Sequence, residues 1–208
     1  MNHQYDADYF LHGRETGKSL YENYRWLPDL TIPMARSIIA HLGIEKNQRI
    51  LDFGCARGYT VKAFNQLGYD AWGIDISEWA IANCDNDVVD SVICGDAKKI
   101  KPNFFNWIIA KDVLEHIHAA GDTIDHLLSF ASVGMFAVVP LAENGYYVVQ
   151  EYEKDVTHVH RMSLMQWTGL FIRHGWEVTA SYRVPGVKDN YSTWERGNGF
   201  ITCHRLEN

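Results

Sequence analysis

The stretch RILDFGCARGYTV, residues 49–61, determines the fold that we expect for this chain. A hydrophobic, strand-like run from Arg49 to Phe53 leads into a turn with glycines at positions 54 and 58, and a helical pattern follows. Beyond it, short apolar runs alternate with helical patterns, which is typical of a parallel sheet covered by helices on both faces. We therefore predict a doubly wound α/β fold of three layers around a seven-stranded, mostly parallel sheet.

The element pattern also predicts how the domain is organised. Strands are expected over 49–53, 71–75, 89–94, 107–110, 135–139, 176–184 and 200–205. A helix is expected over 163–174, where Ser163 and Gln166 form a capping-box pattern, and an earlier helix carries Pro33 in its first turn. We predict a cap and lead-in helix over 1–45 and the main domain over 46–208, with a lid insert at 141–162.

Composition and charge narrow the partners that we expect. The 208 residues are 47% hydrophobic, which suits one domain with a sizeable core. The net charge is −7 and the longest basic run is KKIK at 98–101, so no nucleic-acid partner is expected. The four cysteines show no metal-binding or disulfide spacing, and no run reaches membrane-spanning length. We expect a cytoplasmic protein with no membrane partner, and the sequence leaves its oligomeric state open.

Two phosphate-binding motifs fail when their spacing is counted. A dinucleotide fingerprint starting at Gly54 would need glycine where Ala56 and Tyr59 stand, and Asp52 would repel a pyrophosphate. The stretch GRETGKS at 13–19 has three residues between its glycines where a P-loop needs four, and it follows no predicted strand. The turn therefore favours a ligand without a pyrophosphate.

The spacing Asp52-x-Gly54-x-Ala56-x-Gly58, followed by Asp75 at the end of AWGID, resembles motif I and the acidic second strand of the class I S-adenosylmethionine-dependent methyltransferases. CGDA at 94–97 resembles the third signature of that family. FNWIIAKDVLEHIH at 105–118 resembles its fourth-strand segment, including the LEH tail found in methyltransferases of small molecules.

This resemblance implies an enzyme that uses S-adenosyl-L-methionine and releases S-adenosyl-L-homocysteine. Asp75 would accept hydrogen bonds from the ribose hydroxyls, Asp96 would meet the adenine amino group, and the backbone N–H of Ala97 would meet a ring nitrogen. Ala56 departs from the family pattern, because its methyl group narrows the approach to the cofactor. The full set of expected cofactor-binding residues is Asp52, Gly54, Cys55, Ala56, Gly58, Asp75, Ile76, Asp96, Ala97, Lys111, Asp112 and Val113.

Methyl transfer to a hydroxyl or amine needs a base, and histidine is the side chain suited to that role near neutral pH. The segment DVTHVHRMS at 155–163 follows the fifth strand, and it makes His158 the main candidate. His160 and His116 are secondary candidates. We expect no metal site, because no carboxylate spacing completes the HIH and HVH pairs. Four tyrosines are expected to line the acceptor pocket, namely Tyr5, Tyr21, Tyr24 and Tyr147.

The favoured acceptor is a small-molecule hydroxyl or amine, such as that of a sugar or another metabolite. AKDV at 110–113 stands where DNA base methyltransferases carry a proline-containing motif, which argues against that class. A tRNA or protein methyltransferase stays open as an alternative. So do a cofactor-binding module without activity and a nucleotide-dependent oxidoreductase or kinase.

Overall fold

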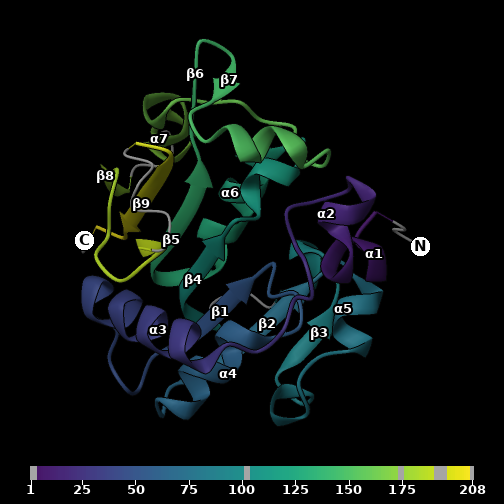
Figure 1. Cartoon of the computed structure of the whole chain (residues 1–208). Coiled ribbons are helices and arrows are strands. Elements are labelled where there is room, and N and C mark those ends of the chain that lie inside the picture. The colour runs from purple at the N-terminus through teal and green to yellow at the C-terminus, as the bar shows by residue number, and fades with distance from the viewer. Residues whose placement is uncertain (1–3, 101–103, 173–175, 190–195, 207–208) are drawn as a thin grey trace.

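The structure is a computed structural model that describes residues 4–100, 104–172, 176–189 and 196–206. Its main feature is a seven-stranded sheet in the order β3-β2-β1-β4-β5-β9-β8 (Figure 1). These strands are β1 (Arg49–Phe53), β2 (Asp70–Asp75), β3 (Val92–Cys94), β4 (Phe105–Lys111), β5 (Ala131–Pro140), β8 (Glu177–Ser181) and β9 (Asn198–His204). The predicted doubly wound α/β sheet is confirmed.

The order of strands reverses at β1, the third of the seven strands. β1 pairs in parallel with β2 on one side and with β4 on the other, while β9 runs antiparallel to both β5 and β8. A crevice forms at such a reversal because the chain leaves the two neighbouring strands in opposite directions. The turn after β1 and the end of β4 therefore lie at the position where this class of sheet binds ligands.

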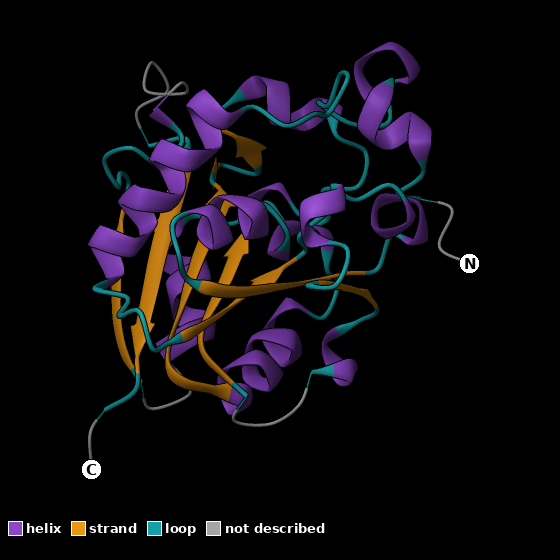
Figure 2. Cartoon of the chain, turned by 90° about the horizontal axis from the view of Figure 1, so that it is seen from below, coloured by secondary structure: helices purple, strands orange, loops and turns teal. Residues whose placement is uncertain are grey.

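Side chains of β4 alternate between two separate cores. Trp107 and Ile109 join a core with α3 (Pro28–Leu42) and α4 (Tyr59–Gln66), whereas Ile108 and Ala110 join a core with α6 (Ala120–Phe130) and α7 (Leu164–Ile172). The period of two along the strand places successive side chains on opposite faces of the sheet. The result is the predicted three-layer arrangement, with helices on both sides of the strands (Figure 2).

The remaining elements are short and surround the ends of the strands. They are α1 (Ala7–Leu11), α2 (Gly13–Thr16), α5 (Glu78–Ala82), the 3-10 helices η1 (Asn86–Val88), η2 (Ala97–Lys99), η3 (Leu114–His116) and η4 (Gln150–Lys154), and the hairpin of β6 (Ala142–Glu143) and β7 (Tyr146–Tyr147). In Figure 1 the hairpin lies at the top and the α1–α2 pair at the right. No helix in the described ranges is both long enough and apolar enough to cross a membrane.

Several predicted boundaries differ from the structure. The helix with Pro33 begins earlier, at Pro28, so Pro33 lies inside α3 instead of in its first turn. Pro28 provides the start because a proline suits the first helical position. In the predicted strand 89–94, only the last three residues form β3, because Asp85 accepts a hydrogen bond from the Asp87 N–H and directs the chain into η1.

The C-terminal strands are also bounded differently. β8 ends at Ser181, and Val184 pairs only with Val187 across a tight turn. The capping box of α7 is confirmed, since the Ser163 N–H donates to Gln166 Oε1 at 2.9 Å and the Gln166 N–H donates to Ser163 Oγ at 3.3 Å. Residues 173–174 of this predicted helix lie outside the described residues.

The segment before α3 packs against the end of the sheet and forms an arm, defined here as residues 4–27. The ring of Phe10 stacks on that of Trp79 with centroids 5.5 Å apart. Ser77 Oγ donates to the Tyr5 carbonyl at 2.6 Å, and Arg57 donates to the Tyr24 carbonyl at 3.0 Å. These contacts hold the arm next to the turns that follow β1 and β2.

Candidate functional site

The turn after β1 depends on three residues in the left-handed region. Gly54, Ala56 and Gly58 have φ values of 78°, 49° and 76°. A Cβ on Gly54 would come within 2.5 Å of the Val113 side chain, and one on Gly58 within 2.7 Å of Val88. Ala56 adopts a conformation that costs an L-residue about 1–2 kcal/mol. The sequence therefore needs glycine at 54 and 58 for two reasons, conformation and space.

A first cavity of about 590 Å³ opens over this turn. This volume is in the range of small-molecule sites. Eight of the predicted cofactor-binding residues line it: Gly54, Ala56, Asp75, Ile76, Asp96, Ala97, Asp112 and Val113. The opposite wall is aromatic and comes from the arm, with Tyr5, Tyr9 and Phe10. The sequence thus identified the sheet side of the cavity, and the arm supplies the other side.

Two acidic side chains at strand ends are oriented by backbone donors. Asp75 Oδ2 accepts from the Ala56 N–H at 2.7 Å, and Oδ1 accepts from the Ser77 N–H at 2.8 Å. Asp96 caps η2 by accepting from the Lys98 N–H at 3.0 Å. Each carboxylate oxygen can accept more than one hydrogen bond, so both groups keep capacity for donors on a ligand.

Three predicted cofactor-binding residues, Asp52, Cys55 and Gly58, line neither this cavity nor the second one described below. Asp52 is only 4% exposed. Burial raises the pKa of Asp52 to about 7, with the Lys111 ammonium opposing the rise and the Asp75 carboxylate adding to it. Cys55 packs into the core beneath the turn, where a Cβ on Gly73 would meet its sulfur at 2.6 Å.

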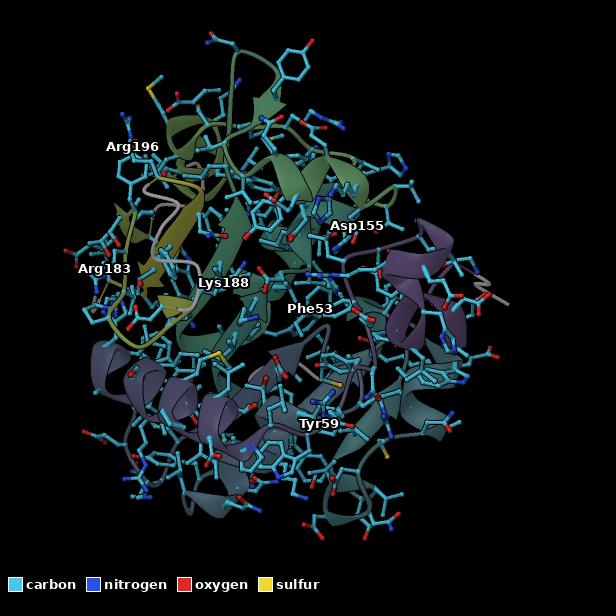
Figure 3. All side chains as sticks on the ribbon, viewed as in Figure 1. Phe53, Tyr59, Asp155, Arg183, Lys188 and Arg196 are labelled. Carbon is cyan, nitrogen blue, oxygen red and sulfur yellow. The ribbon has the colours of Figure 1, made fainter. Side chains whose placement is uncertain are left out.

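A second cavity of about 680 Å³ adjoins the first. Four residues line both cavities: Tyr9, Tyr21, Asp112 and His116. The rest of the second wall includes Lys111, Asp155, His158 and Lys188. Asp155 and Lys188, far apart in sequence, both lie in the central part of the molecule in Figure 3. The two cavities therefore meet at the end of β4, beside His116.

Asp112, at the end of β4, holds two lysines. Its carboxylate contacts Lys111 Nζ at 2.5 Å and Lys188 Nζ at 2.6 Å. Although burial opposes ionisation, these two ammonium groups hold the pKa of Asp112 well below its ordinary value. Lys188 Nζ also lies 3.0 Å from Asn198 Oδ1. The network fixes the loop that carries Lys188 over the second cavity.

His116 and His158 both line the second cavity, where their rings contact each other with centroids 4.7 Å apart. Thr157 Oγ donates to Asp155 Oδ1 at 2.5 Å, and His116 Nδ1 lies 2.7 Å from the same oxygen of Thr157. Because that hydroxyl proton is used on Asp155, His116 Nδ1–H is the donor and Nε2 carries the lone pair.

The same reasoning applies to His158. Its Nδ1 lies 3.0 Å from the Tyr152 carbonyl, which can only accept, so Nε2 again carries the lone pair. Burial, with the charge of His158, lowers the pKa of His116 to about 4, and burial also lowers that of His158. Both rings are therefore neutral at pH 7, and each offers a free lone pair.

Two predicted residues lie away from the cavities. His160 Nε2 is bonded to the Ile117 carbonyl at 2.7 Å, and His160 lines neither cavity. Tyr147 is fully buried and donates to the His160 carbonyl at 2.5 Å instead of lining a pocket. The expected pocket role of Tyr147 is wrong, because the β6–β7 hairpin turns this ring into a small core of its own.

Sequence reasoning missed several residues that line the cavities. Tyr9 and Phe10 come from the arm, and Lys188 bonds Asp112 across 76 positions, for which the sequence gives no local signal. Glu115 stands beside His116 within the LEH tail but was not singled out. By contrast, the rejection of GRETGKS is consistent with Lys18, whose ammonium pairs with Asp6 at 2.9 Å in the arm.

Comparison with known proteins adds family evidence to this geometry. A family model described as a methyltransferase domain matches residues 31–182. No curated protein matches the sequence. A crystal structure of an S-adenosylmethionine-dependent methyltransferase from Archaeoglobus fulgidus is similar, with a TM-score of 0.67 and 16% identity over 86% of this chain and 95% of the other.

Two further structures share the fold. One is a Haemonchus contortus phosphoethanolamine N-methyltransferase in complex with phosphomonomethylethanolamine and S-adenosylhomocysteine, at a TM-score of 0.67 and 16% identity over 83% of this chain and 52% of the other. The other is a Synechocystis magnesium protoporphyrin IX methyltransferase with bound S-adenosylhomocysteine, at a TM-score of 0.63 and 16% identity over 84% of this chain and 83% of the other.

Proposed function

The chain belongs to the methyltransferase-domain family whose model covers residues 31–182, and from this premise we propose that it transfers the methyl group of S-adenosylmethionine to a small-molecule hydroxyl or amine. The observation that carries the proposal is the pair of adjoining cavities that share Tyr9, Tyr21, Asp112 and His116. One cavity suits the methyl donor and the other suits the acceptor. Structures with the same fold contain S-adenosylhomocysteine, which supports the choice of donor.

The donor would occupy the first cavity. The glycine turn is kept open by residues without side-chain bulk, and Asp75 and Asp96 offer carboxylate acceptors to the ribose and the adenine. S-adenosylmethionine, when bound, supplies an electrophilic methyl group on a sulfonium. The aromatic wall of the arm excludes water and presents ring faces, which attract a cation.

The acceptor would occupy the second cavity, where the chain's own side chains handle its proton. His158 Nε2 carries a free lone pair, and Asp155 Oδ2 lies 3.9 Å from it, so a proton gained there is stabilised by a neighbouring carboxylate. His116 stands at the junction of the cavities and orients the acceptor toward the methyl group. Proximity and alignment supply most of the remaining acceleration.

A direct experiment measures S-adenosylhomocysteine release with a panel of small hydroxyl and amine compounds, and with bulk tRNA and protein for comparison. The His158→Asn variant should lower kcat by about 10²–10⁴, the range of a general base, with little change in donor affinity. His160→Asn is the matched control, since His160 belongs to the same segment and lines neither cavity. Turnover confined to tRNA or protein would refute the small-molecule acceptor.

A further inference from the structure

Three potential metal ligands converge at the junction of the two cavities. One ligand atom from each of Glu115, His116 and His158 lies within 4.8 Å of the others. His116 Nε2 and Glu115 Oε1 are 4.0 Å apart. Glu115 and His116 come from η3, directly after β4, and His158 comes from the segment after η4. The carboxylate that sequence reasoning did not find for these histidines is therefore supplied by the residue next to His116.

The two histidines of this cluster offer only lone pairs to the junction. The hydrogen bonds at Nδ1 leave Nε2 of both histidines as acceptors, as argued above. Glu115 is 1% exposed, and its Oε2 has no hydrogen-bond partner in the described part of the chain. A buried acceptor without a donor costs about 1–3 kcal/mol. A cation at the junction would give both Nε2 lone pairs and the unpartnered Oε2 of Glu115 a common partner.

The surroundings also fit metal ligation. A metal-binding histidine usually donates its other ring N–H to a carbonyl or a carboxylate network, which fixes the ring. His158 does so to the Tyr152 carbonyl, and His116 does so to Thr157, which in turn donates to Asp155. The nearby ammonium groups of Lys111 and Lys188 are paired with the Asp112 carboxylate, which offsets part of their positive charge beside the three ligands.

We propose that Glu115, His116 and His158 bind one divalent first-row transition-metal cation, such as Zn²⁺, with its open positions facing the second cavity. Two imidazoles and one carboxylate are a ligand set that suits zinc, iron and their neighbours, and they leave positions for water or substrate. Ligands at about 2.1 Å from such an ion approach each other more closely than the spacing here, so the side chains would close slightly around it. Any proton on Glu115 is released on binding.

The role of the cation, unlike its binding, rests on the proposed function. An acceptor hydroxyl would replace water on the cation, which lowers the pKa of that hydroxyl so that its proton passes to solvent. The oxygen then forms a bond to the methyl carbon while the carbon–sulfur bond breaks and its electron pair stays on sulfur, giving S-adenosylhomocysteine. In the loaded protein, His158 holds the cation, and the cation takes over the activation assigned to the free imidazole.

The test uses the whole protein, freed of metal with a chelator and titrated with Co²⁺ and then Zn²⁺. One equivalent of Co²⁺ should bind and produce visible absorption bands, which Zn²⁺ should displace. Glu115→Gln and His158→Asn should each weaken binding by at least tenfold, and Thr157→Val by about 10- to 100-fold through loss of the supporting hydrogen bond. His160→Asn and the exposed His12→Asn should bind like the unmodified chain.

The outcomes separate this inference from the proposed function. Binding below one equivalent, or binding unchanged in Glu115→Gln and His158→Asn, would overturn the metal site, whether or not the protein methylates an acceptor. Stoichiometric Co²⁺ binding in a protein that methylates nothing would uphold the site and count against the proposed reaction instead. Circular dichroism and thermal unfolding of each variant identify any that fail to fold, and Glu115→Asp then replaces Glu115→Gln, with the same loss expected from its shorter reach.

Discussion

At the residue scale, Asp52 and Asp75 lie on neighbouring parallel strands, next to last in β1 and last in β2, but meet different surroundings. Asp75 receives two backbone hydrogen bonds and faces the first cavity, whereas Asp52 is buried behind the turn. A carboxylate in motif I is readily found in the sequence. Whether that carboxylate is exposed depends on how the arm and the turn pack, and a local sequence pattern does not predict this.

Asp52→Asn should make the protein more stable at alkaline pH. The folded pKa of about 7 is above the unfolded value of about 3.9, so the unfolded chain ionises first and stability falls as pH rises between the two. The variant removes this loss, which is on the order of 2–4 kcal/mol above pH 7 and absent near pH 4. Urea unfolding at pH 5 and pH 8 measures it, with Asp70→Asn as the exposed control. An equal effect at both pH values would show that ionisation is not the cause.

Asp75→Ala should weaken S-adenosylmethionine binding by about 10- to 100-fold, because hydrogen bonds to a charged group contribute roughly 1.5–3 kcal/mol. Isothermal titration calorimetry gives the dissociation constant directly. Asp70→Ala provides the control, since Asp70 begins the same strand and pairs with Arg49 at 2.9 Å, away from both cavities. Unchanged affinity in Asp75→Ala would remove this carboxylate from the donor site.

At the element scale, the strands that could be predicted are those whose apolar pattern is fixed by burial on both faces. β1 was predicted with its observed bounds because its last four residues are buried. β3 was predicted too long because Val89 is apolar yet 59% exposed, in a turn set by Asp85. The helix that contains Pro33 was predicted, but its start was placed near Pro33. The helix begins at Pro28, which suits the first helical position equally well.

The residues of the candidate site show the same contrast between those that a local pattern predicts and those that it does not. Residues on the sheet's own turns were found from spacing, since consecutive strand ends meet at one edge. Those supplied by the arm or by the loop before β9, such as Tyr9 and Lys188, depend on contacts between distant parts of the chain. His160 became a candidate only because it lies two residues after His158 in the same segment. In the structure, its side chain is bonded to the Ile117 carbonyl instead.

Gly54→Ala should both destabilise the protein and reduce donor binding, whereas Gly145→Ala should only destabilise it mildly. Both glycines have positive φ, 78° and 84°, so both substitutions carry a conformational cost of about 1–2 kcal/mol. Only at Gly54 does the new Cβ meet a neighbour, Val113, at 2.5 Å; at Gly145 nothing lies within 4 Å. Thermal unfolding and calorimetric titration are compared for the pair. Equal losses of stability and donor affinity in the two variants would mean that the contact of the new Cβ with Val113 has no effect.

At the scale of the whole molecule, the arm is the element that closes the site. Its aromatic residues form the wall opposite the glycine turn, and it is held by contacts such as Ser77 to the Tyr5 carbonyl. Secondary structure here is short, with helices of five and four residues. Segments of this kind owe their order to tertiary contacts and open locally at low cost.

Saturating S-adenosylmethionine should therefore slow backbone amide exchange in the arm by about tenfold or more, because the ligand binds the docked arm and stabilises it by mass action. The N–H of Tyr24, bonded to the Phe10 carbonyl at 3.0 Å, is a suitable reporter. Hydrogen exchange followed by mass spectrometry measures the change. Amides of the β6–β7 hairpin, whose residues line neither cavity, serve as the internal reference. Slowing of equal size in both segments would indicate general stabilisation instead.

The second cavity draws much of its wall from the arm, the segment with Asp155 and His158, and the loop with Lys188, whereas one whole wall of the first is formed by the sheet's own turns. Peripheral segments tolerate insertion and replacement far better than buried strands do. Related proteins are therefore expected to differ more in the acceptor that they modify than in the donor that they bind. The sheet would then stay similar among such relatives, and the loops around it would account for the differences between them.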